Sequence, residues 1–152
     1  MLGENKMDIS NTIVVLLVED DPADQKLVQN ALANQEIDHA LYVAGSGEEA
    51  LEYLQRSKCG DTKSPHPNLI LLDLNMPGMG GKEFLKRIKA DNNLCDIPVV
   101  VLTVSDTETD IQESYKLHAA GYVQKSASPQ EFQKVMDKLA KYWFEISSVA
   151  KG

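Results

Sequence analysis

The segment Leu69-Ile70-Leu71-Leu72-Asp73-Leu74-Asn75-Met76-Pro77 carries the clearest structural signal in this sequence. Four large aliphatic residues lead directly into an acidic residue, and a proline follows. A short aliphatic run that ends in turn-forming residues is typical of a strand buried on both faces of a parallel sheet. Ligands bind at the carboxyl ends of the strands in such sheets. We therefore predict that Asp73 lies at the rim of a sheet, and we take it as the candidate active centre.

Four further segments are rich in aliphatic or β-branched residues, and we predict that they are strands. They lie within residues 13–18, 38–44, 99–103 and 121–125. Each of the five strands is followed by a segment whose apolar residues recur at helical spacing. Five alternations of strand and helix imply a single α/β domain, with a doubly wound five-stranded parallel sheet and right-handed crossovers.

Capping residues mark the expected starts of several helices. Ser46, Ser105 and Ser128 are each followed three residues later by glutamate, which is the pattern of a capping box. Pro22 suits the first turn of the helix that follows the first strand. Asp21 is the expected cap of that helix, and we do not assign it to the site.

The length of 152 residues is enough for one domain with a substantial core and too short for two ordinary ones. We assign residues 12–149 to the domain and residues 1–11 and 150–152 to tails. No apolar run approaches the ~18 residues of a membrane-spanning helix. The N-terminal residues also lack the apolar core of a secretory signal. We therefore expect no membrane partner.

The formal net charge of −8 argues against a protein that binds nucleic acid through its phosphates, and it allows a cation site. Two cysteines, Cys59 and Cys95, form no disulfide framework. A reducing cytoplasm is therefore the simplest compartment. The histidines and cysteines also lack the spacing of a metal site.

Polar side chains lie at the ends of four of the five predicted strands. Glu19 and Asp20 follow the first strand, Asp73 follows the third, Thr103 ends the fourth and Lys125 ends the fifth. The carboxyl ends of parallel strands meet at one edge of the sheet. We therefore expect three carboxylates, one hydroxyl and one ammonium to lie close together.

Three carboxylates at one site repel one another, so either their pKa values rise or a cation binds among them. Mg²⁺ prefers oxygen ligands and is the expected cofactor. The ammonium of Lys125 and the hydroxyl of Thr103 can contact a phosphoryl group, and Asp73 can act as its nucleophile. This set of residues indicates phosphoryl transfer onto Asp73.

These motifs resemble the receiver domain of two-component response regulators. The resemblance covers about residues 13–146 and rests, in this order, on Glu19-Asp20, Asp73-Leu74-Asn75-Met76-Pro77 with Gly81, Thr103, and Tyr122-Val123-Gln124-Lys125. It implies a (βα)5 fold of the flavodoxin-like or CheY-like type. It also implies a phosphorelay protein that is not an ordinary enzyme, in which Asp73 accepts a phosphoryl group from a histidine of a sensor kinase.

The same resemblance assigns roles to the neighbours of Asp73 at the metal site. It implies that Asp20 and Asp73 bind Mg²⁺ directly, together with the backbone carbonyl of Asn75. Glu19 is then expected to act through a water molecule.

The resemblance also implies that Thr103 and Lys125 contact the phosphoryl oxygens, and that Thr103 and Tyr122 form a switch pair. Three residues depart from the family pattern, and one of them, Glu19 in place of aspartate, is a common variant that changes little. Ser126 stands where a proline usually follows Lys125, so the loop with the lysine can be placed differently. Val104 is bulkier than the residue that many members have after Thr103, so we expect slower entry of the phosphoryl group or slower attack by water.

A narrower resemblance is to the small response regulators that are paired with cyanobacterial phytochromes. It rests on Leu102-Thr103, Asp110-Ile111, Ser114-Tyr115-Lys116-Leu117-His118-Ala119 and Tyr142-Trp143-Phe144. Members of that group are lone receivers that tend to dimerise. The resemblance therefore implies a phytochrome-type kinase as partner and a homodimer.

We expect the C-terminal helix to contribute to that dimer. Trp143 lies on the apolar stripe of the helix and is predicted to lie in the core. At 3.6 residues per turn, Phe144 falls about 120° around the helix from Phe132 and is predicted to point away from the core. Tyr142 and Phe144 are therefore the candidate interface residues.

Three other functions stay open. An aspartyl-phosphate hydrolase needs an acid two residues after its nucleophile, where this chain has Asn75. A flavin-binding module needs a phosphate loop rich in Ser, Thr and Gly after the first strand, where residues 19–21 are acidic. A receiver-like interaction module with impaired phosphotransfer fits the complete set of motifs poorly, although Val104 and Ser126 leave room for it.

Overall fold

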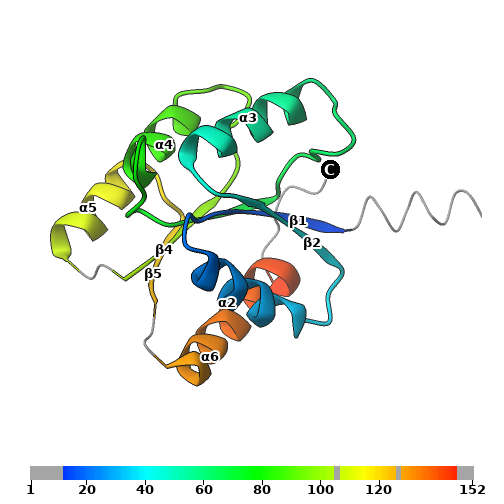
Figure 1. The fold of residues 1–152 in the computed structure, drawn as a ribbon, viewed down its shortest axis with the longest axis vertical. Coiled ribbons are helices and arrows are strands. Elements are labelled where there is room, and N and C mark those ends of the chain that lie inside the picture. Colours follow the sequence, from blue (N-terminus) through cyan, green and yellow to red (C-terminus); the bar gives the residue numbers. More distant parts are fainter. Residues whose placement is uncertain (1–11, 105–106, 126–127, 147–152) are drawn as a thin grey trace, which may run out of the picture.

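The computed structural model describes residues 12–104, 107–125 and 128–146. Five parallel strands form one sheet in the order β2-β1-β3-β4-β5, and a helix follows each strand (Figure 1). This architecture confirms the predicted doubly wound α/β fold. The elements are β1 (Ile13–Val18), α2 (Pro22–Ala33), β2 (His39–Ala44), α3 (Gly47–Lys58), β3 (Leu69–Leu72), α4 (Gly80–Lys89), β4 (Val99–Thr103), α5 (Glu108–Lys116), β5 (Gly121–Gln124), α6 (Pro129–Ala140) and the π-helical turn η1 (Lys141–Ile146).

Burial differs between the central strands and the edge strands. All residues of β3 and β4 are buried, and only one residue of β1 is not. The edge strands β2 and β5 are half-exposed along most of their length. A strand that is covered on both faces needs apolar residues at every position. The continuous aliphatic runs of the sequence therefore correspond to the centre of the sheet.

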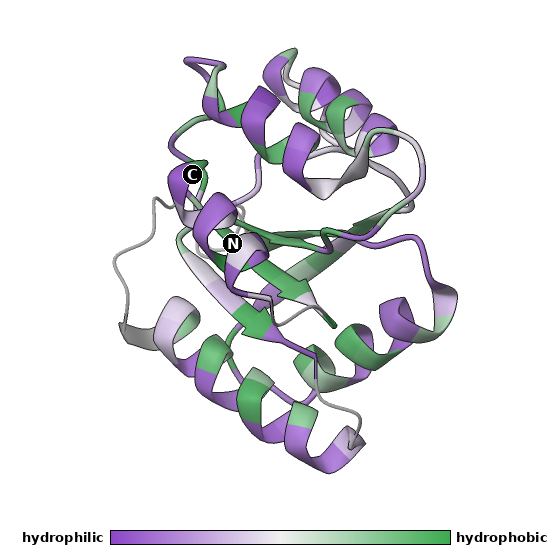
Figure 2. Ribbon diagram, turned by 90° about the vertical axis from the view of Figure 1, so that its left-hand side faces the viewer, coloured by the Kyte–Doolittle hydropathy of each residue, from purple (hydrophilic) through white to green (hydrophobic). Residues whose placement is uncertain are grey.

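Helices cover both faces of the sheet. Helices α3, α4 and α5 lie on one face, and α2 and α6 lie on the other (Figure 1). Figure 2 shows the apolar strands between helices whose outer sides are hydrophilic. Neighbouring residues of one strand belong to different cores, because successive side chains point to opposite faces: Leu16 and Ile70 pack on the first face, and Leu17 and Leu71 on the second.

The strand register brings the carboxyl ends together. Val18 pairs with Leu72, and Leu72 pairs with Val101. Thr103 pairs with Gln124 at the end of β5. The residues that follow these strands therefore leave the sheet side by side at one edge, as predicted.

Most of the predicted helix caps are confirmed. Asp21, Ser46 and Ser128 each accept a hydrogen bond from a backbone N–H in the first turn of α2, α3 and α6. The predicted start at Ser105 is wrong for α5, because Thr107 directly precedes this helix and its hydroxyl accepts the capping bond. Ser105 itself lies outside the described residues.

The prediction for Phe144 is wrong. Its side chain is only 5% exposed and packs in the core beside Phe132, and its ring centroid lies 5.4 Å from that of His39. The cause is η1, because the i→i+5 bonds of a π-helix put more residues into each turn and rotate Phe144 back toward the core. Trp143 is partly buried against the same core, whereas Tyr142 is 52% exposed.

Several expectations concern residues that the structure does not describe. The two predicted tails, the domain boundary at residue 149 and the effect of Ser126 all lie outside the described residues. Among the described residues, no helix is long and apolar enough to cross a membrane.

Candidate functional site

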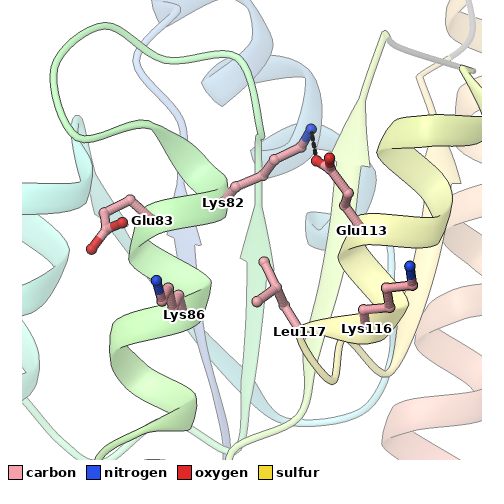
Figure 3. A pocket seen from close by; sticks show the side chains of 6 residues that line it. All are labelled: Lys82, Glu83, Lys86, Glu113, Lys116 and Leu117. Atoms are coloured by element: carbon pink, nitrogen blue, oxygen red, sulfur yellow. Dashed lines mark hydrogen bonds and ion pairs between the residues drawn. The ribbon is translucent and has the colours of Figure 1, made fainter.

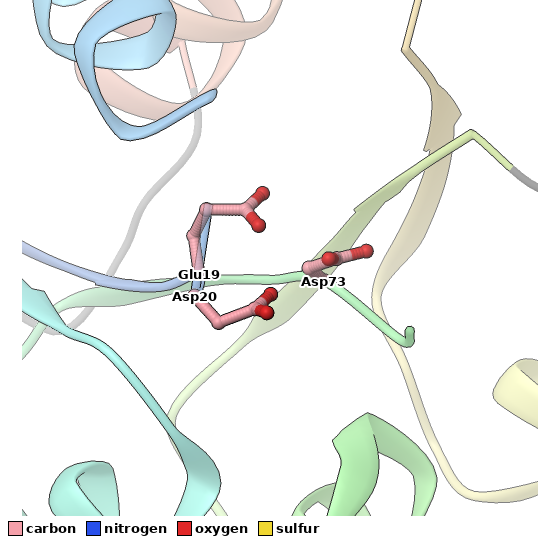
Figure 4. A group of neighbouring side chains, drawn as sticks. All are labelled: Glu19, Asp20 and Asp73. Carbon is pink, nitrogen blue, oxygen red and sulfur yellow. The ribbon is translucent and has the colours of Figure 1, made fainter. Parts of the chain in front are cut away.

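Three carboxylates meet at the carboxyl edge of the sheet, as predicted. Glu19 and Asp20 follow β1, and Asp73 follows β3 (Figure 4). Each offers one oxygen that lies within 4.8 Å of the oxygens of the other two. Glu19 and Asp73 are buried, at 1% and 6% exposed, whereas Asp20 is exposed. A set of carboxylate oxygens with one side open to solvent suits a hard divalent cation that keeps several of its waters.

A cavity of about 290 Å³ opens beside these carboxylates. Asn75, Val104 and Lys125 contribute to its wall, together with two further acids of the segment after β1, Asp21 and Asp24. Val104 is 65% exposed, so its side chain stands at the solvent side of the cavity. The site is therefore a small acidic cavity with one cationic side chain, that of Lys125, in its wall and one apolar side chain, that of Val104, beside its opening.

The ammonium of Lys125 is shared among carboxylates from three elements. The side chain of Lys125 is 5% exposed, and its Nζ donates hydrogen bonds to Glu19 Oε1 and to Asp24 Oδ2, the latter at 2.9 Å. Asp73 Oδ2 is farther away, at 3.9 Å. Burial opposes the charge of Lys125, but the hydrogen bonds to Glu19 and Asp24 outweigh it and raise the pKa of the lysine.

Burial also opposes the charge of Glu19, and here it is the dominant effect. It raises the pKa of the Glu19 carboxyl to about 7, and the nearby charge of Asp73 adds to this effect. The hydrogen bond from Lys125 offsets only part of the rise. A cation that binds at this site would therefore compete with a proton on Glu19 near neutral pH.

Asn75 connects Asp73 with the end of β4. Its backbone N–H donates to Asp73 Oδ1 at 3.3 Å, and its side-chain Nδ2 donates to Thr103 Oγ1 at 3.1 Å. Thr103 is fully buried. The backbone N–H of Lys125 also donates to the carbonyl oxygen of Thr103, at 2.7 Å. The predicted hydroxyl is thus joined to Asp73 through one loop residue, Asn75, and the main chain at Lys125 is bonded to the end of β4.

Tyr122 lies one strand away from this group. It is half-buried on β5, where it pairs with Val101 and packs against the core under α3 and α4. Thr103 and Tyr122 therefore lie on adjacent strands, which is a necessary condition for the predicted switch pair.

Sequence reasoning missed two contacts. Asp24 pairs with Lys125, and the side chain of Asn75 holds the hydroxyl of Thr103. An acidic residue in the first turn of the helix that follows the β1 carboxylates was the available signal for Asp24. The contact of Asn75 could not be found from spacing, because it depends on how the loop after β3 turns.

A second cavity of about 330 Å³ lies between α4 and α5 (Figure 3). Leu117 and the stems of Lys86 and Lys116 contribute to it, and Lys82 crosses above them to reach α5. Lys82 Nζ lies 2.5 Å from a carboxylate oxygen of both Asp110 and Glu113. This cavity holds none of the strand-end residues, and its ion pairs tie two helices together.

The comparison with protein families bears directly on this arrangement. The sequence pattern described as the response regulator receiver domain matches residues 15–137. The match spans most of the chain and includes every candidate residue at the edge of the sheet. The chain belongs to the response regulator receiver family. It is accordingly a signalling protein of that family and not a member of a conventional enzyme family.

Two relatives of this receiver cover nearly its whole length. The response regulator Rcp1 from Synechocystis is 44% identical over 133 residues, which are 87% of this chain and 89% of Rcp1. The probable methanogenesis regulatory protein FilR2 from Methanothrix harundinacea is 31% identical over 137 residues, which are 90% of this chain and 87% of FilR2.

Solved structures confirm the fold of this receiver and its likeness to phytochrome regulators. The Mn²⁺-bound form of Rcp1 superposes with a TM-score of 0.83 at 42% identity, covering 91% of this chain and 99% of that one. The phosphorylated cyanobacterial phytochrome response regulator RcpA gives a TM-score of 0.85 at 38% identity, covering 92% and 99%.

Proposed function

We propose that Asp73 accepts a phosphoryl group from a phosphohistidine of a sensor kinase in a Mg²⁺-dependent reaction. The observation that carries this proposal is the position of the Asp73 carboxylate. It lies within 4.8 Å of oxygens of Glu19 and Asp20 and 3.9 Å from the ammonium of Lys125. A cation site and an ammonium therefore flank one nucleophilic carboxylate, which is the arrangement that phosphoryl transfer needs.

The residues of this chain supply position and charge. An oxygen of Asp73 forms the new P–O bond while the P–N bond to the kinase histidine breaks, and the imidazole leaves. Asp20, Asp73 and the backbone carbonyl of Asn75 would hold Mg²⁺, with Glu19 acting through water, and the bound ion would supply positive charge near the phosphoryl oxygens. Lys125 supplies a further positive charge at the same oxygens.

Thr103 and Tyr122 are the proposed switch pair. The hydroxyl of Thr103 accepts a hydrogen bond from Asn75, and a hydroxyl can also donate its own hydrogen, here to a phosphoryl oxygen on Asp73. A shift of Thr103 toward that oxygen changes the packing on β5, where Tyr122 is only half-buried and can move. Phosphorylation is thereby passed from the acceptor to the edge of the sheet.

A phytochrome-type histidine kinase is the proposed partner. The support is the similarity to Rcp1 and to RcpA, the latter solved as a phosphorylated cyanobacterial phytochrome response regulator. Rcp1 was solved with Mn²⁺ bound. Mn²⁺ and Mg²⁺ both favour oxygen ligands, and the carboxylates of this chain suit either ion.

We also propose that the protein forms a homodimer through the open edge of the sheet. Tyr142 and Tyr115 are 52% and 48% exposed. A groove of about 390 Å³ has Tyr115, Tyr122 and Trp143 in its wall, and the ring of Tyr142 packs edge-on against that of Trp143. Aromatic residues are enriched at protein interfaces. Phe144 no longer belongs to the proposed interface, because it is buried in its own fold.

A cytoplasmic location without a nucleic-acid partner completes the proposal. Cys59 and Cys95 are both free thiols, which suits a reducing compartment. The net charge of −8 opposes binding to phosphate backbones.

Intact-protein mass spectrometry tests the central proposal. Incubation with acetyl phosphate and Mg²⁺ should add one phosphoryl group, a gain of about 80 Da that carries new negative charge. Asp73→Asn should show no gain, whereas Asp38→Asn, at an exposed site near the opposite edge of the sheet, should gain the same mass as the wild type.

Two results would contradict the proposal. A wild-type protein that gains no mass would point to an interaction module without phosphotransfer. A gain that persists in Asp73→Asn would place the acceptor elsewhere.

A further inference from the structure

Asp24 is a further carboxylate in the acidic cavity, and like Glu19 it is bonded to Lys125. It lies in the first turn of α2 and is not one of the three clustered carboxylates. Its Oδ2 lies 2.9 Å from Lys125 Nζ, whereas the acceptor oxygen Asp73 Oδ2 lies 3.9 Å from the same nitrogen. The ammonium is thus held by Asp24 and lies beyond hydrogen-bond distance of the acceptor.

The hydrogen bonds of Lys125 define what must change on phosphorylation. An ammonium has three N–H donors, and the described contacts direct two of them to Glu19 and Asp24. A phosphoryl group on Asp73 would place new anionic oxygens on the side where the lysine now makes only its longest contact. The third N–H can point to these oxygens, and their charge draws Nζ toward Asp73 and away from one of its two present partners.

Exposure determines which bond is given up. The side chain of Glu19 is 1% exposed, so losing its partner would leave a buried charge unpaired, which is costly. The side chain of Asp24 is 31% exposed, so water can replace the ammonium there at a small cost. Asp24 is the partner that Lys125 can release.

We propose that Asp24 is a positioning residue that holds Lys125 away from the acceptor until a phosphoryl group takes the ammonium over. This inference rests on the proposed function of Asp73. Asp24 competes with phosphoryl oxygens for one cation, so it favours the unphosphorylated state. Loss of the Asp24 contact should therefore strengthen the binding of a phosphoryl group at Asp73.

Asp21 provides a matched control for the charge of Asp24. Both acids line the same cavity and lie at the start of α2. Asp21 caps the helix by accepting the Ala23 N–H at 2.9 Å, and none of the described ion pairs of Lys125 involves it. Asn is as good a cap as Asp. Asp21→Asn therefore removes one negative charge from the cavity and keeps both the cap and the Lys125 contacts.

The test is calorimetric titration with beryllofluoride, a mimic of the phosphoryl group, in the presence of Mg²⁺. Asp24→Asn should bind beryllofluoride at least about threefold more tightly than Asp21→Asn. Only the first variant removes the charged partner of Lys125, so that its ammonium can turn to the beryllofluoride. Asp24→Glu keeps the charge and the reach to Lys125, and it should bind like the wild type. Thermal melting curves establish that each variant is folded.

The direction of the change in beryllofluoride affinity distinguishes a positioning role of Asp24 from damage to the site. A variant with a disturbed site would bind beryllofluoride more weakly, and that result would overturn the inference. Equal affinities of Asp24→Asn and Asp21→Asn would also overturn it, because they would reduce the role of Asp24 to its charge. A wild-type protein that binds no beryllofluoride and gains no phosphoryl mass would instead refute the proposed function on which this inference rests.

Discussion

Gly81 packs against the main chain of Asp73 so closely that a Cβ at position 81 would stand 2.4 Å from the Asp73 carbonyl oxygen. The amide of Gly81 also donates a hydrogen bond to the carbonyl oxygen of Leu74, at 3.1 Å. Helix α4 therefore begins in direct contact with the loop that carries Asp73, the proposed acceptor. Only a residue without a side chain allows this approach.

Gly81→Ala should destabilise the fold and impair phosphorylation together. The new methyl group would meet the backbone, which cannot move aside as a flexible side chain can, and overpacking of this kind costs about 1–3 kcal/mol. Urea unfolding and the phosphoryl mass gain measure the two effects. Gly121→Ala is the control, because its Cβ would lie 3.6 Å from the Val100 side chain in ordinary contact. Equal stability of both variants would contradict the close packing at Asp73.

Metal affinity should depend on pH through Glu19. The pKa of Glu19 is raised to about 7, and a proton on this carboxyl group competes with a cation at the site. Mg²⁺ affinity measured by calorimetry should fall by about tenfold from pH 8 to pH 6, since one proton is taken up over that range. Glu19→Gln should bind Mg²⁺ with little dependence on pH. A wild-type affinity that stays constant would refute the role of the glutamate.

Glu19 should also change the stability of the metal-free protein with pH. Because its folded-state pKa exceeds its ordinary value of 4.5, the folded chain binds more protons than the unfolded chain between these values. The contribution of Glu19 to the free energy of unfolding is therefore greatest below pH 4.5 and is lost as the pH rises to about 7. Mg²⁺ favours the ionised form and should reduce this loss. Urea unfolding of wild type and Glu19→Gln over this range, with and without Mg²⁺, measures the difference.

Val104 should slow access to the acceptor. Its side chain lines the acidic cavity and is 65% exposed. Val104→Ala should change the free energy of unfolding by less than about 0.5 kcal/mol, because the position is on the surface. The variant should gain and lose the phosphoryl group a few-fold faster, as followed by mass spectrometry over time. Val43→Ala, an exposed valine on β2, should show wild-type rates; identical rates in both variants would exclude steric control by Val104.

Phe144 and Tyr142 should affect different properties. Phe144→Ala removes a buried ring beside His39 and should lower the free energy of unfolding by about 3 kcal/mol, the lower end for a buried Phe. Tyr142→Ala should leave stability nearly unchanged and shift the proposed dimer toward monomer. Light scattering coupled to size exclusion measures the mass of each variant. A dimer that survives Tyr142→Ala would remove this residue from the interface.

The fold and the main groups of the site could be predicted because they depend on periodicity. Aliphatic runs identify strands that are buried on both faces, and parallel strands end at the same edge. The residues after the strands, Glu19, Asp20 and Asp73, therefore had to lie together, and they do. The same rule predicted that Lys125 lies at this edge, but it could not predict the distance of Lys125 from Asp73.

The remaining features depend on local geometry that periodicity does not contain. The burial of Phe144 results from a π-helical turn, and a constant 3.6-residue repeat cannot anticipate one. The Asn75 contact with Thr103 depends on the path of a loop. The hydrogen bond between Asp24 and Lys125 depends on where α2 lies relative to the edge of the sheet. Each of these features is set by packing between elements and not by the sequence of one element.

The bonds of Lys125 also bear on the order in which the chain folds. They connect this residue with Glu19 and Asp24 across 106 and 101 positions of sequence. A chain emerging from the ribosome completes β1 and β3 long before the lysine is available, and Glu19 then has no cationic partner from β5. Contacts between such distant residues form late, because closing a long loop costs entropy. The proposed phosphoacceptor site is therefore expected to become complete only in the last stage of folding, when Lys125 reaches Glu19 and Asp24.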